Sequence, residues 1–362
     1  MRADLPPADH DDIIYPGTIP FVLAHLACLG AIWTGVPASA VVIAVALYVI
    51  RMFAATAGYH RYFSHRSYRT SRAGQFLLAL LAQSAAQRGV LWWAAKHRHH
   101  HRHSDTEHDV HSPRQRGFWY AHLGWIFRPQ HHDTDLELVA DLARYPELRW
   151  LDRHQYIPAV ALAVAVWLVA GWPGLIVGFF WSTVALYHGV FLINSLAHVH
   201  GTRRYVTGDD SRNNFWLALI TMGEGWHNNH HAYQRSTRQG FRWWEVDLTF
   251  YILTVLSWLR IVWDLGTPPP DLVRNERPLG RGTIERVARQ VAATFSAEQM
   301  AREIRTTLVH LPHFPSLDEL RARAEAMYAQ TPSMDEIVKR AREVLTERVS
   351  LCLLQMEDLA TA

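Results

Sequence analysis

The chain has 362 residues, a formal net charge of +3 and two cysteines, Cys28 and Cys352. So small a net charge gives no reason to expect nucleic-acid binding, and two distant cysteines argue against a disulfide framework or an iron–sulfur cluster. Residues 13–50 and 154–202 contain no Asp, Glu, Lys or Arg. Because a membrane crossing needs about 20 apolar residues, each stretch is long enough for two, and the sequence predicts an integral membrane protein.

The first uncharged stretch predicts two helices, over residues 18–35 and 38–59, joined by a short turn at 35–37. Arginines follow the second helix at positions 66, 69 and 72. Since basic residues collect on the cytoplasmic side of a membrane, this end of the second helix is expected in the cytoplasm. Arg51 lies about two turns inside that helix, so it either snorkels or faces a protein-lined interior.

The second uncharged stretch predicts a third and a fourth crossing over residues 156–197, with a turn near 171–174. Between the two stretches, residues 73–95 predict a helix on the cytoplasmic membrane surface, broken at Arg88-Gly89, and residues 97–153 are polar. The expected fold is all-α: four transmembrane helices under a helical cytoplasmic cap, with both termini in the cytoplasm. A bacterial inner membrane is the expected location.

The composition changes near residue 272, which predicts a membrane domain over 1–271 and a helical cytoplasmic extension over 272–362. Three capping boxes, in which a Ser precedes an acidic or amide residue by three positions, predict helix starts at Ser296, Ser316 and Ser333. The extension shows no catalytic motif. It is expected either to cover the cytoplasmic face or to hold a partner.

Three histidine groups lie at the predicted cytoplasmic ends. His97, His100 and His101 have the i, i+3, i+4 spacing that shares one helix face, and a second trio repeats it: His227, His230 and His231. His60 and His65 are about 140° apart on a regular helix, so either the helix is distorted there or the pair reaches two ions. The groups together predict a site for two metal ions with imidazole ligands.

Imidazole suits zinc, copper, iron and nickel, and the absence of cysteine from these groups argues against structural zinc. A shell of neutral ligands leaves the positive charge of two divalent ions uncompensated, which favours a bridging oxygen anion. Two irons that activate O2 fit this chemistry, and a substrate held among membrane helices would be a lipid. A membrane metal transporter or sensor is the alternative, although transport requires ligands within the bilayer. His99 and His111 lack a repeated spacing and are predicted in loops or behind the ligands.

The three groups occur together with Asn194-Ser195-Leu196-Ala197-His198 and Gly223-Glu224-Gly225-Trp226. In this order the motifs resemble the membrane fatty acyl-CoA desaturases of the stearoyl-CoA Δ9 type, in the bacterial form without a cytochrome b5 domain. The resemblance runs from about residue 18 to about residue 250. It implies O2-dependent formation of a cis Δ9 double bond in a saturated long-chain acyl-CoA, as a step of fatty acid biosynthesis.

The resemblance also implies two iron ions, which cycle between Fe2+ and Fe3+, with O2 as co-substrate. Electrons would come from a ferredoxin-like or other donor with its reductase. The implied iron ligands are histidines, with Asn194 acting through a water: His60, His65, His97, His100, His101, His198, His227, His230 and His231.

A bent acyl tunnel past the irons is implied as well. Trp93 matches a tunnel-lining tryptophan of the family, whereas Phe191 stands where the family carries tryptophan. Ordinary helix packing is the alternative for Trp93 and Phe191. Tyr48 and Met52 share one helix face and are expected to close the tunnel and favour C16 over C18 chains. Five arginines could meet CoA phosphates: Arg66, Arg69, Arg128, Arg144 and Arg149. A phospholipid carrier, or a lipid or alkane hydroxylase, stays open.

Overall fold

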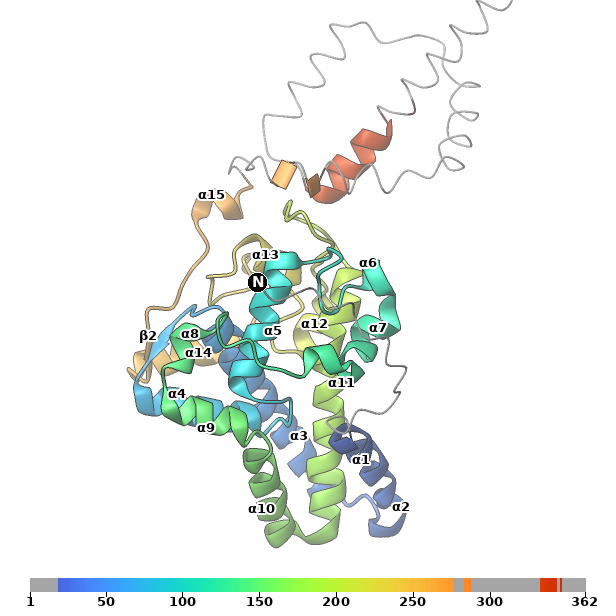
Figure 1. Cartoon of the computed structure of the whole chain (residues 1–362), viewed down its shortest axis with the longest axis vertical. Helices are drawn as coiled ribbons and strands as arrows, with labels where there is room; N and C mark the ends of the chain where they lie inside the picture. Colours follow the sequence, from blue (N-terminus) through green and yellow to red (C-terminus); the bar gives the residue numbers. More distant parts are fainter. Residues whose placement is uncertain (1–18, 276–282, 285, 288–332, 344–345, 347–362) are drawn as a thin grey trace, which may run out of the picture.

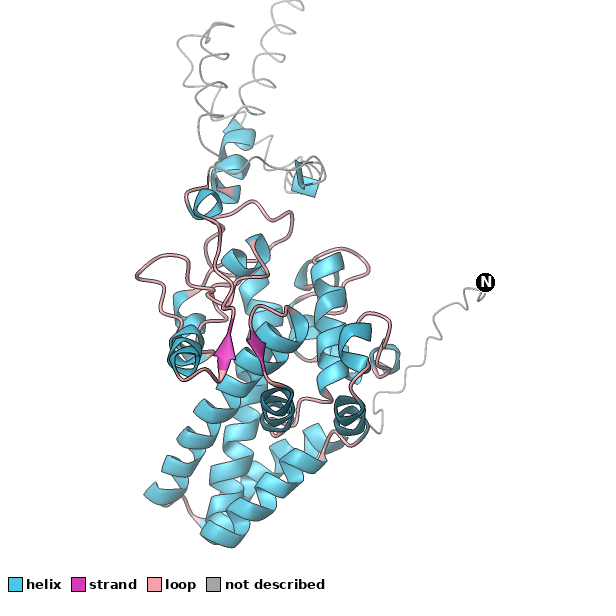
Figure 2. Ribbon diagram, turned by 90° about the vertical axis from the view of Figure 1, so that its left-hand side faces the viewer, coloured by secondary structure: helices cyan, strands magenta, loops and turns pink. Residues whose placement is uncertain are grey.

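A computed structural model describes residues 19–275, 283–284, 286–287, 333–343 and 346. These residues are mostly helical. Four apolar helical segments, which we call limbs, lie at one end of the molecule beneath a broader cap (Figures 1 and 2). The all-α expectation is wrong in one detail. Two-residue strands β1 (Arg69–Thr70) and β2 (Val262–Trp263) pair antiparallel, with Arg69 opposite Trp263.

The first two limbs reverse where the sequence predicts a turn. The first limb comprises α1 (Ile19–Ala27), η2 (Cys28–Gly30) and α2 (Ala31–Thr34). Gly35 then adopts a φ of 70°, a value that glycine tolerates at no steric cost. The second limb is α3 (Ala38–Phe53), which runs directly into the π-helix η3 (Ala54–Ser64).

The third and fourth limbs form one folded-back helical run. The third is α10 (Ile157–Pro173), and the fourth comprises η6 (Gly174–Trp181), α11 (Ser182–Ser195) and η7 (Leu196–His198). The chain reverses at Gly171, where φ is 62° and ψ is −158°, as the sequence predicts. Gly178 allows η6 to approach α3 closely, because a Cβ there would lie 2.7 Å from Ile43 Cγ2.

Two helical runs of the described chain have the length and composition of membrane spans, namely Ala38–Ser64 and Ile157–His198. The first limb, Ile19–Thr34, is a shorter apolar helix. The predicted count of four crossings therefore remains a prediction.

Arg51 faces the protein interior, the second of its two alternatives. The side chain is fully buried between α3 and α11, where its guanidinium donates to the hydroxyls of Ser182 and Thr183 and to the carbonyl of Phe179. A buried cation is costly unless its donors are satisfied. These bonds explain how the helix accommodates the charge.

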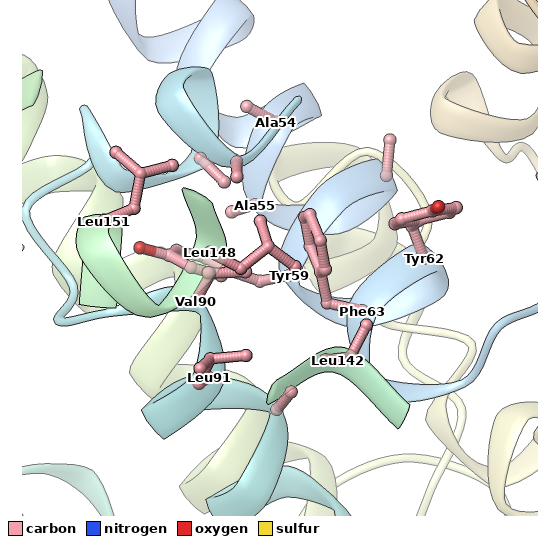
Figure 3. Close-up of a cluster of buried hydrophobic side chains, with 14 of the residues drawn as sticks. Ala54, Ala55, Tyr59, Tyr62, Phe63, Val90, Leu91, Leu142, Leu148 and Leu151 are labelled. Carbon is pink, nitrogen blue, oxygen red and sulfur yellow. The ribbon is translucent and has the colours of Figure 1, made fainter. Parts of the chain in front are cut away.

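The cap is built on an apolar core beside the limbs. α4 (Arg72–Gln83) and α5 (Val90–His103) are separate helices, which confirms the predicted break at Arg88-Gly89. Leu91 of α5 packs with Leu142 of α8 (Ala140–Ala143) and with Leu148 and Leu151 of α9 (Pro146–Arg153) (Figure 3). Phe63 of η3 joins the same cluster. This core fixes α5 against η3, and both carry predicted ligands.

Short elements complete the cap. They are α6 (Pro113–Arg116), α7 (Phe118–His122), η4 (Gly124–Phe127), η5 (Pro129–His131), α12 (Phe215–Ile220), α13 (His227–Ala232), α14 (Leu248–Trp258) and α15 (Pro270–Val273). Helices α5 and α13 contain the two predicted histidine trios, so the helical conformation assumed for both trios is confirmed.

The longest helical stretch described in the C-terminal extension covers residues 334–343. It begins at the predicted capping box. The Ser333 amide donates to Glu336 Oε2 at 2.9 Å, and the Glu336 amide donates to Ser333 Oγ at 3.3 Å. The boxes at Ser296 and Ser316 lie outside the described residues, and the division at residue 271 remains a prediction.

Candidate metal centre

Helix α5 carries three of the predicted ligands, and its first turn is anchored by a carboxylate from another helix. Asp152 Oδ1 of α9 accepts the backbone N–H groups of Leu91 and Trp92 at 2.9 and 3.0 Å. The first N–H groups of a helix have no partner within it, so Asp152 acts as a cap from outside. Gly89 is needed for this approach, because a Cβ there would lie 2.0 Å from Asp152 Oδ1.

The π-helix η3 resolves the spacing of His60 and His65. The His65 amide donates to the His60 carbonyl at 3.2 Å, which is the i to i+5 bond of a π-helix. Residues five positions apart therefore return to the same side, and the rings of the two histidines lie 4.9 Å apart. The helix is distorted, as the first alternative proposed, and both rings join one cluster.

Five histidines form the first cluster, which we call cluster one: His60, His65, His97, His101 and His230. One nitrogen of each lies within 4.8 Å of the others. The Nε2 atoms of His65 and His97 are 2.8 Å apart, and those of His101 and His230 are 2.8 Å apart. These residues come from η3, α5 and α13, so three separate segments converge on one point.

Four histidines form the second cluster, cluster two: His100, His198, His227 and His231. Their ligand nitrogens also lie within 4.8 Å of one another, and the Nε2 atoms of His198 and His227 are 3.0 Å apart. His100 and His101 are consecutive on α5 but point into different clusters, as do His230 and His231 on α13. The nine predicted histidine ligands are thus divided five and four between two adjoining sites.

Carboxylates hold the outer nitrogens of four histidines, and the sequence analysis did not identify them. Nδ1 of His198 donates to Asp105 at 2.8 Å, Nδ1 of His100 to Asp109 at 2.9 Å, and Nδ1 of His231 to Asp209 at 2.7 Å. Glu224, within the Gly223–Trp226 motif, pairs with Nδ1 of His60. Their negative charge corrects the expectation of an uncompensated, purely neutral site.

This arrangement fits metal ions. A ring whose Nδ1–H is donated to a carboxylate presents an unprotonated Nε2, which is the form that binds metal. Two ligand nitrogens of cluster two, Nε2 of His100 and Nε2 of His231, are buried and make no hydrogen bond. Such orphaned acceptors are costly unless a cation satisfies them.

The electrostatics of the site agree with this protonation pattern. Burial and neighbouring imidazoles hold the pKa values of His97, His101 and His230 well below the usual range, so these rings stay neutral. Burial opposes ionisation of Asp105, but the adjacent His198 outweighs it and lowers the pKa of Asp105 to about 2. The three neutral rings of cluster one are thus in the form that binds divalent ions.

An apolar cavity adjoins cluster one. Its wall includes Phe21, Trp93, His97, Tyr187, Val190, Phe191 and Asn194. Trp93 lies between two rings, stacked on Tyr59 at 5.3 Å and on His97 at 5.0 Å between centroids. Trp93 and Phe191, both predicted to line a substrate tunnel, therefore line a cavity that reaches a predicted ligand.

The sequence matches the family model described as fatty acid desaturase over residues 33–257. The sn-1 stearoyl-lipid 9-desaturase of Anabaena variabilis is 37% identical over 252 residues, which are 68% of this chain and 91% of that protein. The sn-2 palmitoyl-lipid 9-desaturase of Nostoc sp. is 37% identical over 219 residues, 59% of this chain and 76% of the relative. Acyl-CoA 5-desaturase AL21 of Anemone leveillei is 35% identical over 248 residues, 67% and 77% of the two chains.

The chain belongs to the fatty acid desaturase family. It is a membrane oxidoreductase that introduces double bonds into fatty acyl chains, and its family uses a di-iron centre. This assignment decides against the metal transporter that the sequence alone left open.

The two other predicted tunnel residues of the desaturase lie behind this cavity. Met52 is 0% exposed and packs in one buried cluster with Leu186 and with Val190, a cavity-lining residue. Tyr48 lines a different cavity, together with Gly189, and donates its hydroxyl to the Ile220 carbonyl at 2.7 Å. Met52 thus belongs to one buried cluster with Val190, which lines the first cavity, and with Tyr48, which lines the second.

Basic residues of the desaturase line part of the same cavity, but they are not the predicted arginines. Arg88 and Lys96 contribute to the lining, with His131 and His132 beside them. Arg66 instead approaches Asp141 at 3.9 Å, and Arg69 approaches Asp264 at 3.4 Å. None of the five predicted arginines is among the lining residues.

Proposed function

We propose that the protein forms a cis double bond between C9 and C10 of a saturated long-chain acyl-CoA, in fatty acid biosynthesis. One O2, two electrons and two protons, with two hydrogens taken from the chain, yield two waters. The observation that carries the proposal is that a largely apolar cavity is lined by Trp93 and Phe191 together with His97 of cluster one. A cavity of this kind is suited to an acyl chain and not to a polar substrate.

Cluster one and cluster two would each hold one iron ion, with Asn194 acting on one of the two ions through a water. Asn194 lines the cavity and lies four residues before His198. When bound, the two ions supply an oxidant able to remove hydrogen from an unactivated methylene group.

The protein's own residues position the chain and exclude water. Trp93 is held between Tyr59 and His97, so it forms a rigid wall beside the predicted ligands. Tyr187 and Phe191 stack at 6.0 Å between centroids and 10° between planes, and they form part of the opposite wall from α11. A closed apolar site both aligns the reacting methylene group and prevents side reactions with water.

The acyl-CoA carrier is supported by the basic residues of the cavity. Arg88 and Lys96 can bind phosphate, a group that CoA and phospholipids both carry. The relatives include enzymes named for lipid substrates and others named for acyl-CoA. A phospholipid acyl chain is therefore the second candidate.

The proposal places the metal centre and both chain ends on the cytoplasmic side of a bacterial inner membrane, above four crossings. The two longest apolar runs end at Ser64 and His198, beside predicted ligands. Electrons would arrive from a ferredoxin-like or other carrier with its reductase.

Expression in cells that lack unsaturated fatty acid synthesis tests the reaction. We expect monounsaturated chains, with mass spectrometry of derivatised esters locating the bond at C9. Isolated membranes supplied with labelled stearoyl-CoA or with labelled stearoyl phospholipid distinguish the two carriers. Hydroxylated chains in place of unsaturated ones would assign the protein to the hydroxylase alternative.

A further inference from the structure

The C-terminal helix 334–343 packs on a loop of the cap formed by residues 203–210, which we call the 203–210 loop. Asp335 accepts two hydrogen bonds from Arg203, one from the backbone N–H at 3.0 Å and one from Nε at 2.8 Å. Val206 of the loop is buried in one cluster with Val287, Met334, Ile337, Val338 and Ala341. The contact thus combines a charge-assisted pair with a small apolar core.

The capping box fixes how this helix meets the loop. Reciprocal bonds between Ser333 and Glu336 start the helix at residue 334, so Met334 and Asp335 both fall in its first turn. Met334 is only 2% exposed, although it belongs to a short helix on the surface of the cap. The loop also lies close to Arg286, since a Cβ at Gly208 would be 2.8 Å from Arg286 Nε.

The other side of the 203–210 loop supports cluster two. Asp209 accepts Nδ1–H of His231 at 2.7 Å. The backbone N–H of Asp210 donates to Asp105 Oδ2 at 2.7 Å, and the same oxygen accepts Nδ1–H of His198 at 2.8 Å. Arg203 approaches Asp210 at 3.7 Å. Contacts therefore run without interruption from Asp335 to two histidines of cluster two.

Cluster one is supported from elsewhere. Its outer carboxylate, Glu224, pairs with His60 and also accepts from Arg61 at 3.0 Å. Arg61 in turn pairs with Asp247 at 2.9 Å, and all three of these charged side chains are buried. No residue of the 203–210 loop takes part in these interactions. The loop also bonds to α13 through Tyr205 and Asn228 at 2.7 Å, and α13 carries His230 of cluster one. A disturbance of the loop should therefore act mainly on cluster two, where it reaches the carboxylates behind His198 and His231.

We propose that the C-terminal helix is a brace for the second metal site. By holding Asp105 and Asp209 in place, this helix controls how tightly cluster two retains its ion. The inference rests on the proposed two-metal centre and adds a positioning role for Asp335 and Arg203. Partners behind metal-bound histidines fix the ring orientation and the tautomer, and their loss typically weakens metal binding about 10–100-fold.

Metal release from the purified full-length chain tests the brace. The protein is loaded with Fe2+ without oxygen, and transfer of iron to a chelator is followed over time. In Asp335→Ala and in Val338→Asp we expect one of the two ions to leave about tenfold faster or more, while the release rate of the other changes much less. Glu147→Ala, which breaks the exposed 2.7 Å pair with Arg72 elsewhere in the cap, is the matched control and should change neither rate.

The charge-swapped double variant Arg203→Asp with Asp335→Arg re-forms the side-chain pair. It should therefore release the affected ion more slowly than Asp335→Ala does, although still faster than the wild type. Wild-type release of both ions from both single variants would overturn the brace. Equal acceleration of both ions, with a lowered melting temperature of the metal-free protein, would also overturn it, because that pattern shows general destabilisation. The readout needs no turnover, so a wild type that holds two ions but makes no double bond contradicts only the proposed function.

Discussion

The Nε2 atoms of His60 and His230 lie 3.0 Å apart, although 170 residues separate them in the chain. Nδ1 of His60 faces the carboxylate of Glu224 and therefore carries the ring proton, which leaves a lone pair on Nε2. Nε2 of His230 either donates its proton to this lone pair or shares a cation with it. Because three further ligand nitrogens lie within 4.8 Å of these two, one metal ion in cluster one would satisfy all five at once.

Removing one ligand from cluster one should release one ion. In His65→Ala we expect iron content to fall from about two toward one per chain and desaturation to be lost, because the ion in cluster one loses one of its ligands. Metal analysis and fatty acid analysis of the same preparation measure both effects. His99→Ala is the control, since His99 is on the same helix α5 but contacts the His108 carbonyl at 2.8 Å. Loss of iron from both variants alike would contradict the assignment.

Met52 should limit how far an acyl chain reaches beyond the metal centre. In Met52→Ala we expect relatively more C18 product, because Met52 packs in one cluster with a lining residue of each cavity and a smaller side chain leaves more room there. The cavity left behind should also lower stability by about 2–5 kcal/mol. Mixed C16 and C18 substrates, analysed by gas chromatography, give the ratio.

Gly189→Ala is the opposing variant at the same place. A Cβ at this position would lie 3.0 Å from Met52 Cε and 3.1 Å from the Tyr48 hydroxyl. It should press Met52 toward the cavity lined by Trp93 and Phe191 and shift the products toward C16. If both substitutions leave the C16 to C18 ratio unchanged, Met52 and Tyr48 do not close the tunnel.

Lys96 should contribute to binding a phosphate-bearing carrier, and this contribution should not change between pH 5 and 8. Burial lowers the pKa values of His131 and His132 to about 4, so both rings are neutral in this range and gain positive charge only as the pH falls through that value. We expect Lys96→Ala to raise KM for acyl-CoA several-fold with little change in kcat. A KM that drops steeply from pH 7 to 5 would show that the rings are charged.

Asp152 should be a stability residue for the metal-bearing helix. Asp152→Ala leaves the N–H groups of Leu91 and Trp92 without their carboxylate acceptor, and loss of a helix cap typically costs about 1–2 kcal/mol. Thermal unfolding of the metal-free protein measures the cost. Asp135→Ala removes an exposed turn carboxylate that accepts the Glu137 N–H at 3.0 Å, and it should have a much smaller effect. Similar shifts in the two variants would refute the capping role.

Much of the site was predictable because its signals are local. Helical periodicity places His97 and His101 on one face wherever the helix lies, and an uncharged stretch such as 154–202 has the same preference for lipid in any fold. The turns at Gly35 and Gly171 and the capping box at Ser333 were predictable for the same reason, since each depends on the backbone preferences of a few adjacent residues.

Only the tertiary structure decided how the histidines are divided. His100 and His101 are neighbours in sequence, yet they enter different clusters because about 100° of helix rotation separates them. The π-helix that brings His65 beside His60, and the carboxylates of Asp105 and Asp209 behind cluster two, depend on packing between segments far apart in the chain. Spacing along a sequence reports which residues share a helix face, whereas the partners of that face are set by the free energy of the whole packed fold.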